Sequence, residues 1–219
     1  MKQAFIFDMD GVLIDSENEW IKLEEDFYPK LFGKELTEKI GNTIGISLDQ
    51  IYQKACRFGF SMERAPFDAY WDKIAKKVYS TAPITENIDI LGDYLIQNNI
   101  HLGIVSASKI SWISYVIPRL SFKNSIEIVI SLAERRDLEH KPHPAGYIAA
   151  MKSLGTTSEN TFVLEDSNHG IQSAKSSGAF TIALRENLTP GYTHTIQADA
   201  YADTILQVID ILKNTMHNV

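Results

Sequence analysis

The chain has 219 residues, of which 44% are hydrophobic, and its formal net charge is −7. This length is enough for one hydrophobic core, with at most a smaller satellite domain. No block of Lys and Arg stands out, so we exclude a nucleic-acid-binding protein and expect a small molecule as the partner. A lone cysteine, Cys56, and the lack of any apolar run near the roughly 20 residues of a membrane span predict a cytoplasmic protein with no disulfide, membrane contact or signal peptide.

Short apolar runs alternate with helical patterns over most of the chain. The strand-like runs are Ala4–Phe7, His101–Val105, Glu127–Ile130, Phe162–Leu164 and Phe180–Leu184. Between them lie helices that are expected to end at Gly155 and Gly178, and Asp203 is the expected cap of the last helix. This alternation predicts an α/β fold, a parallel sheet with helices on both faces.

Residues 17–82 break the alternation, because they hold three helical periodicities and no convincing strand. The helical stripes run from Trp20 to Leu31, from a capping box at Ser47 and Gln50, and from Phe67 to Val78. We therefore predict a helical cap domain at 17–82, inserted into a core made of residues 1–16 and 83–219. Two linkers, near Ile14–Ser16 and Ser80–Pro83, would join the two parts, and such a domain can act as a lid.

Polar residues follow four of the predicted strands. They are Asp8 and Asp10 after the first strand, Ser106, Ala107 and Ser108 after the second, Lys141 further along after the third, and Glu165 and Asp166 after the fourth. Ligands of open parallel sheets bind at the carboxyl ends of the strands, so these residues are the candidate site. Four carboxylates packed so closely repel one another, and a divalent cation resolves the conflict. Oxygen ligands without His or Cys suit Mg²⁺.

The remaining groups of this set fit phosphoryl transfer. A carboxylate can attack phosphorus and form an aspartyl-phosphate. A hydroxyl and backbone N–H groups can hold the phosphoryl oxygens, and a lysine can neutralise charge. The residues alone leave open which of the aspartates attacks.

Four motifs occur in a fixed order along the chain: DMDGV, the serine of IVSAS, the lysine of HKPHP, and VLEDSNHGIQSAKSSGA. Together they resemble the haloacid dehalogenase superfamily of Mg²⁺-dependent phosphotransferases. The helical insertion directly after DMDGVLIDSE is similar to the beta-phosphoglucomutase-like branch of sugar-phosphate phosphatases and mutases. The resemblance implies a Rossmann-like catalytic core with an inserted helical cap.

The resemblance also implies a role for each matching acid. Asp8 would be the nucleophile and a Mg²⁺ ligand. Asp10 would protonate the leaving group, then activate water, and lend its backbone carbonyl to the metal. Asp166 would complete the metal site, with Glu165 beside it as a direct ligand or as a ligand through water.

A phosphate-binding group is implied in the same way. Its expected members are Gly11, Ser106, Ala107, Ser108 and Lys141. Within this group, the resemblance gives Ser106 and Lys141 a part in catalysis, because the hydroxyl would hold the transferring phosphoryl group and the ammonium would offset its charge.

Two positions depart from the mutase pattern. In the mutase pattern, a His near the place of Trp20 and an Arg near the place of Leu48 serve substrate orientation and proton handling. Because Trp20 offers neither an acid nor a base, Asp10 is expected to act largely unassisted. We interpret Trp20, Trp71 and Tyr70 as cap core. The prediction is a monomeric Mg²⁺-dependent phosphatase of small phosphorylated metabolites, with sugar phosphates first. The alternatives are a sugar phosphomutase and a non-catalytic binding protein that retains the fold.

Overall fold

The computed structural model describes residues 2–41 and 48–216. Within them, six parallel strands form one sheet in the order β3-β2-β1-β4-β5-β6. The strands are β1 (Ala4–Phe7), β2 (His101–Ser106), β3 (Ile126–Ser131), β4 (Thr161–Glu165), β5 (Phe180–Leu184) and β6 (Ala200–Ala202). The predicted α/β fold is confirmed, and the five predicted strands differ from the observed ones by at most one residue at an end. The short β6 was not predicted.

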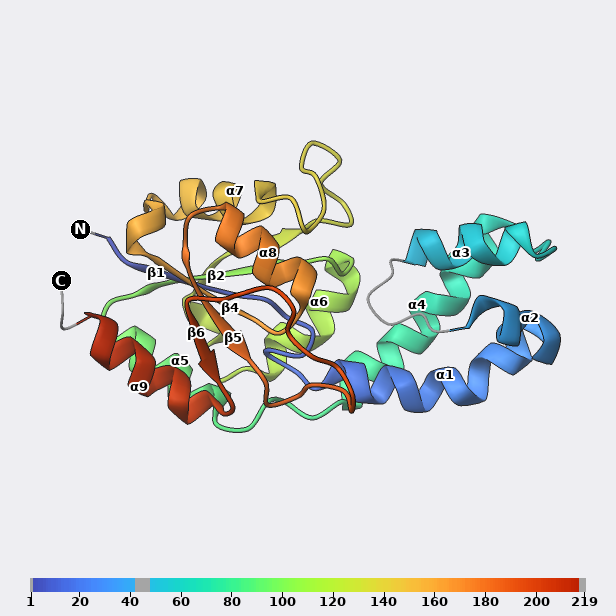
Figure 1. Ribbon diagram of the computed structural model, residues 1–219, viewed down its shortest axis with the longest axis horizontal. Coiled ribbons are helices and arrows are strands. Elements are labelled where there is room, and N and C mark those ends of the chain that lie inside the picture. The colour runs from blue at the N-terminus through green and yellow to red at the C-terminus, as the bar shows by residue number, and fades with distance from the viewer. Residues whose placement is uncertain (1, 42–47, 217–219) are drawn as a thin grey trace.

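Helices cover both faces of the sheet (Figure 1). One face carries α5 (Ile88–Gln97), α6 (Ile110–Val116) and α9 (Ile205–Met216), and the other carries α7 (Ala145–Leu154) and α8 (Asn168–Ser176). Three short 3₁₀ turns complete this part: η1 (Ile117–Arg119), η2 (Lys123–Ser125) and η3 (Ser158–Asn160). Because side chains alternate along a strand, Phe5 and Phe7 pack on the first face, and Ala4 and Ile6 on the second.

The helix ends follow the sequence signals with one exception. Gly155 takes the left-handed conformation at the end of α7, and Gly178 has a φ of 84° just after α8. The predicted cap of the last helix is wrong by one residue. The hydroxyl of Thr204 accepts from the backbone N–H of Gln207 at 3.3 Å, so Thr204 caps the helix. The side chain of Asp203 pairs instead with Arg185, which follows β5.

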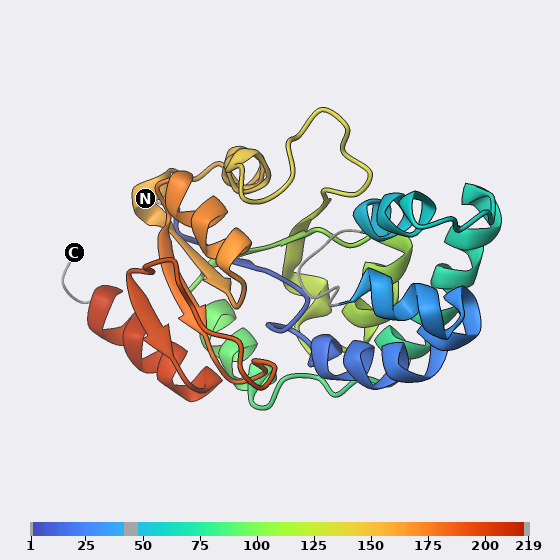
Figure 2. The ribbon, with the colours of Figure 1, turned by 45° about the vertical axis from the view of Figure 1, so that its right-hand side comes forward.

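In the inserted region, the residues outside the gap at 42–47 form four helices, α1 (Ser16–Phe32), α2 (Lys34–Ile40), α3 (Leu48–Arg57) and α4 (Arg64–Thr81). The sequence predicted three, because the seven residues of α2 are too few to show a clear periodicity. Ser47 of the predicted capping box lies outside the described residues. Figures 1 and 2 show these cap helices together at one end of the molecule, beyond the carboxyl ends of the strands.

The cap helices pack around an apolar cluster of their own. Its buried members are Phe27, Tyr28, Phe32, Ile40, Ile51, Ala55, Phe67 and Trp71. The interpretation of Trp71 as cap core is confirmed, and Tyr70 packs against the same cluster. Trp20 contacts both this cluster and the core cluster under the sheet. Trp20 therefore lies at the seam between the cap helices and the sheet.

The two chain crossings between the cap helices and the sheet lie side by side. The backbone N–H of Asp15 donates to the carbonyl of Pro83 at 2.9 Å, and that of Thr85 to the carbonyl of Leu13 at 3.2 Å. A separate apolar cluster and two adjacent crossings are in keeping with a domain division at 17–82, which stays a prediction.

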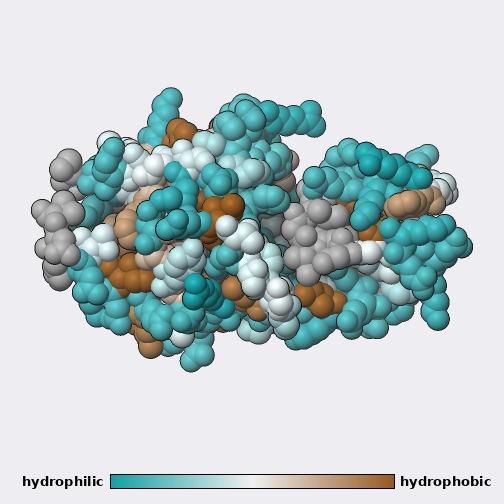
Figure 3. Space-filling model, viewed as in Figure 1, coloured by the Kyte–Doolittle hydropathy of each residue, from teal (hydrophilic) through white to brown (hydrophobic). Residues whose placement is uncertain are grey.

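Hydrophilic residues cover most of the face that Figure 3 shows, and the hydrophobic residues there lie in small separate patches. None of the helices within the described residues combines the length and the apolar character that crossing a membrane requires.

Candidate active site

Three of the four predicted carboxylates converge where strands β1 and β4 end. Asp8 comes directly after β1, Glu165 is the last residue of β4, and Asp166 follows it. Because the two strands are neighbours and parallel, one carboxylate oxygen from each residue lies within 4.8 Å of the others. All three residues are buried. The chain adds β2 and β3 on one side of β1, and β4, β5 and β6 on the other side. The strand order therefore reverses between β1 and β4, and open α/β sheets bind their ligands at such a point.

This burial makes the cluster electrostatically unfavourable. Loss of solvent, followed by the charges of Glu165 and Asp8, raises the pKa of Asp166 well above its usual range. Burial also raises the pKa of Asp8 well above its usual range, and the charge of Lys141 opposes that shift only in part. The donor set consists of carboxylate oxygens alone, which suits a hard cation such as Mg²⁺.

Lys141 brings a buried positive charge into this cluster. Its Nζ donates to Asp8 Oδ1 at 2.5 Å, to Glu165 Oε1 at 2.6 Å and to the carbonyl of Val105 at 3.2 Å, and its side chain is only 8% exposed. Burial lowers the pKa of Lys141, but the charges of Asp8 and Glu165 outweigh burial, and the pKa lies well above the usual lysine value. The lysine is therefore a permanent cation beside the Asp8 carboxylate.

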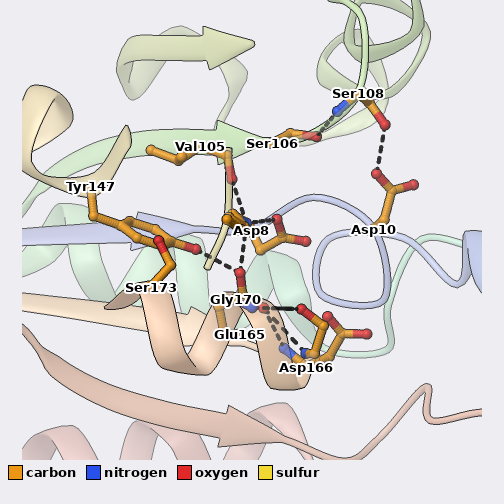
Figure 4. A network of polar contacts seen from close by, with 12 residues as sticks. Asp8, Asp10, Val105, Ser106, Ser108, Tyr147, Glu165, Asp166, Gly170 and Ser173 are labelled. Carbon is orange, nitrogen blue, oxygen red and sulfur yellow. Dashed lines mark hydrogen bonds and ion pairs between the residues drawn. The ribbon is translucent and has the colours of Figure 1, made fainter. Parts of the chain in front are cut away.

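Glu165 is the hub of the polar network in Figure 4. Its Oε1 accepts from Lys141 and from the hydroxyl of Tyr147, at 2.6 and 2.7 Å. Its Oε2 accepts from the backbone N–H of Asp166 at 3.1 Å, and from the backbone N–H and the hydroxyl of Ser167 at 3.2 Å each. With 0% exposure and donors on both oxygens, this carboxylate fixes Lys141 and the turn that carries Asp166. Sequence reasoning missed Tyr147.

Asp10 stands apart from the cluster, beside Ser108 (Figure 4). Its Oδ1 accepts from the hydroxyls of Ser16 and Tyr79, at 2.7 and 2.8 Å, and its Oδ2 accepts from the hydroxyl of Ser108 at 2.8 Å. Glu17, at the start of α1, lies close by: burial, followed by the charge of Asp10, raises the pKa of Glu17 to about 7. Sequence reasoning missed both Glu17 and Tyr79.

The predicted phosphate-binding serines lie at the end of β2, Ser106 as its last residue and Ser108 in the loop that follows. Ser106 is fully buried, and its hydroxyl accepts from the backbone N–H of Ser108 at 3.0 Å. The hydroxyl of Ser131, at the end of β3, donates to the carbonyl of Ser108 at 2.7 Å. Ala107 is exposed between the two serines. These bonds fix the loop from below and leave its tip open to a ligand.

Gly11 lies against Asp166. It has a φ of 76°, and a Cβ on it would lie 1.9 Å from Asp166 Oδ2, so no side chain fits there. Two residues that sequence analysis did not single out hold this region in place. The side-chain amide of Asn187 donates to the carbonyl of Gly11 at 3.1 Å, and Nε2 of His194 lies 2.6 Å from the carbonyl of Asp166.

A methyl group at Gly170 is expected to disrupt the site. A Cβ there would lie 1.8 to 2.0 Å from the carboxylate atoms of Glu165, so Gly170→Ala forces Glu165 away from its donors. Alanine by itself favours a helix by about 1 kcal/mol over glycine. We nevertheless expect Gly170→Ala to lower the free energy of unfolding by about 2–4 kcal/mol, because buried partners are left unpaired.

Urea unfolding of Gly170→Ala beside His169→Ala measures this effect. His169 is the exposed neighbour on the same helix, and its replacement should change the free energy of unfolding by less than about 0.5 kcal/mol. Equal stability of Gly170→Ala and the wild type would show that the Glu165 carboxylate is not confined by its donors and by Gly170.

Comparisons with protein families, other proteins and solved structures each find similar proteins. A family model described as haloacid dehalogenase-like hydrolase matches residues 5–184. Hexitol phosphatase B of Escherichia coli K12 is 27% identical over 187 residues, which are 83% of this chain and 82% of that protein. Among solved structures, a beta-phosphoglucomutase from Clostridium difficile has a TM-score of 0.72 and 21% identity, over 100% of this chain and 98% of its own. A haloacid dehalogenase family hydrolase from Deinococcus radiodurans, with bound phosphate and sodium, has a TM-score of 0.67 and 19% identity, over 97% and 96%.

Proposed function

The chain belongs to the haloacid dehalogenase-like hydrolase family, and on that premise we propose that it is a Mg²⁺-dependent phosphatase that hydrolyses small phosphate monoesters through an aspartyl-phosphate on Asp8. The predicted enzyme class, a hydrolase of phosphoric monoesters, is confirmed by the family match and by relatives named as phosphatases. The observation that carries the proposal is the buried contact of Asp8 with Lys141, beside the carboxylates of Glu165 and Asp166.

Asp8 has the features of a nucleophile for phosphorus. It lies directly after β1, and its Oδ1 accepts from the buried ammonium of Lys141. Lys141 keeps charge balanced as the phosphoryl group reaches the Asp8 oxygen, because an ammonium in a buried site stabilises developing negative charge strongly. Ser106 and the exposed backbone at Ala107 would hold the other phosphoryl oxygens.

The residues present fit a magnesium ion. The carboxylates of Asp8 and Asp166 would hold it, together with the backbone carbonyl of Asp10. Glu165 would contribute through water, because five donors already occupy its two oxygens. When bound, the ion would lower the charge of the phosphate ester and the repulsion among the carboxylates.

Asp10 would serve the leaving group and then the water. It lies on the cap side of the site, where the part of the substrate beyond the phosphate has to sit, and its carboxylate is within reach of the loop that would bind phosphate. A carboxyl there can protonate the departing oxygen, and the resulting carboxylate can take a proton from the attacking water.

Three features favour hydrolysis over the mutase reaction. Trp20 and Leu48, at the two places where the mutase pattern differs, pack as apolar residues against both the cap cluster and the core cluster. Lys109, in the loop after β2 that would bind phosphate, is paired with Asp72 of α4 at 2.9 Å. Lys76 and Lys77 are exposed. A mutase has to retain a second phosphate under its cap, which calls for a cationic donor such as Arg.

The proposed substrates are small phosphorylated metabolites, and sugar or polyol phosphates come first. The hexitol phosphatase among the relatives supports this class. The cap helices cover the side on which the leaving group sits, so that their residues select among esters while the phosphate end stays the same.

One assay separates phosphatase from mutase. The purified protein is given beta-glucose 1-phosphate with Mg²⁺ and a catalytic trace of the 1,6-bisphosphate, and both products are followed over time. We expect inorganic phosphate to form faster than glucose 6-phosphate, because water is the acceptor. Faster formation of glucose 6-phosphate would favour the mutase, and failure to turn over any ester in a panel of sugar, polyol and aryl phosphates would favour the non-catalytic alternative.

A further inference from the structure

Tyr79 links the cap helices to Asp10. It lies near the end of α4 and is 2% exposed. Its hydroxyl donates to Asp10 Oδ1 at 2.8 Å, its oxygen lies 3.2 Å from the hydroxyl of Ser108, and the indole Nε1 of Trp20 donates to it at 3.4 Å. This buried hydroxyl contacts a carboxylate of the candidate site, yet no step of the proposed phosphoryl transfer uses it.

The direction of the hydrogens decides what this contact does. A hydroxyl carries a single hydrogen. Tyr79 gives its hydrogen to Asp10 Oδ1, as does Ser16, and Ser108 gives its own to Oδ2. Donors on both oxygens hold the Asp10 carboxylate in one rotation about its side-chain bonds. Of the three donors, only Tyr79 comes from the far end of the inserted segment.

The tyrosine is itself firmly held. Its ring packs against the rings of Trp20 and Trp112, with centroid distances of 6.1 and 5.8 Å, and these two rings also contact each other at 6.1 Å. The guanidinium of Arg119 donates to the carbonyl of Tyr79 at 2.7 Å and to that of Ala82 at 2.6 Å. Side chains from α1, α6 and η1 therefore fix both the ring and the backbone of this residue, which makes its hydroxyl a rigid donor.

We propose that Tyr79 is a positioning residue for Asp10: it holds the carboxyl group of Asp10 where the acid form of this group can give its proton to the leaving-group oxygen. This inference rests on the proposed function, because it takes Asp10 as the acid of the phosphatase reaction. It also revises the expectation that Asp10 acts unassisted. Trp20 does not supply an acid or a base, but its indole N–H supports the tyrosine that holds Asp10.

Leaving groups that differ in their need for a proton test this role. An alkyl phosphate such as glucose 6-phosphate expels an alkoxide and needs the acid, whereas 4-nitrophenyl phosphate expels a stable phenolate and does not. We expect Tyr79→Phe to lower kcat/KM by about 10- to 100-fold for the alkyl ester, a fraction of what general acid catalysis contributes. For the aryl ester we expect a change of less than about 3-fold, since phosphoryl transfer to Asp8 is untouched.

The matched control is Tyr70→Phe. Tyr70 lies on the same helix, half-buried against the ring of Phe27, and its replacement should leave both rates unchanged. Trp20→Phe removes the indole donor while keeping an aromatic ring. It should lower kcat/KM by less than Tyr79→Phe does, and again more for the alkyl ester than for the aryl ester. This second variant keeps the test valid if Tyr79→Phe folds poorly.

A double-mutant cycle with Asp10→Asn completes the test. If Tyr79 acts through Asp10, Tyr79→Phe should lower the residual alkyl-ester rate of Asp10→Asn by less than about 3-fold, because the effects of coupled residues do not add. Equal losses on both esters, or losses that multiply in the double variant, would overturn the positioning role. A wild type that turns over neither ester would contradict the proposed phosphatase function itself, an outcome distinct from an active wild type with equal losses.

Discussion

Replacement of Asp8 by asparagine is expected to lower the turnover of every phosphate ester by at least about 10⁴-fold, as the loss of a covalent nucleophile does in other hydrolases. The amide has the shape of the carboxylate but cannot attack phosphorus. It also removes a charge whose burial is unfavourable, so the variant should fold and be at least as stable as the wild type. Turnover on an ester panel and thermal unfolding measure the two effects on the same samples.

The same two measurements, repeated without and with Mg²⁺, test the proposed metal requirement. Removal of divalent cations with EDTA should abolish turnover of the wild type, and Mg²⁺ should restore it. Mg²⁺ should also raise the unfolding temperature of the wild type more than that of Asp8→Asn, because the variant lacks one proposed ligand. Asp203→Asn is the control, since Asp203 forms an exposed pair with Arg185, and should behave as the wild type. Substantial turnover by Asp8→Asn, or a wild type indifferent to EDTA, would rule out the assigned mechanism.

The candidate site was largely predictable because it lies at strand ends. A buried parallel strand is recognised by its apolar run, and the carboxyl ends of neighbouring strands meet at one edge. Asp8, Glu165 and Asp166 could therefore be grouped without knowledge of side-chain positions. Lys141 was placed in the same set, further along after the third strand, but its position in a loop does not by itself show that its ammonium reaches Asp8.

The residues that the sequence did not reveal come from helices and loops. Tyr147 lies on α7 and Tyr79 on α4, and each looks like an ordinary core aromatic in its helical pattern. What makes them part of the site is the direction of one hydroxyl, which depends on how a helix docks against the sheet. Asn187 and His194 lie in the segment between β5 and β6, where no periodicity indicates which side chains turn inward.

Removal of the Lys141 ammonium is expected to weaken both folding and catalysis. Lys141→Met keeps the length of the side chain but leaves the buried oxygens of Asp8 and Glu165 without their cation. Breaking a buried ion pair from one side costs about 3–5 kcal/mol of the free energy of unfolding. Loss of a group that stabilises transition-state charge costs about 10²- to 10³-fold in kcat.

Urea unfolding in the absence and presence of Mg²⁺ separates two explanations for such a loss. If the cluster is a metal site, the variant has more uncompensated negative charge than the wild type, and Mg²⁺ should restore a larger share of its stability. Lys175→Met is the control, because Lys175 pairs with Asp199 where both side chains are about a third exposed, and its loss should cost about 1 kcal/mol at most. Lys141→Met could instead be unstable and gain no more free energy of unfolding from Mg²⁺ than the wild type gains. That result would show that the lysine, and not a metal ion, balances the buried carboxylates.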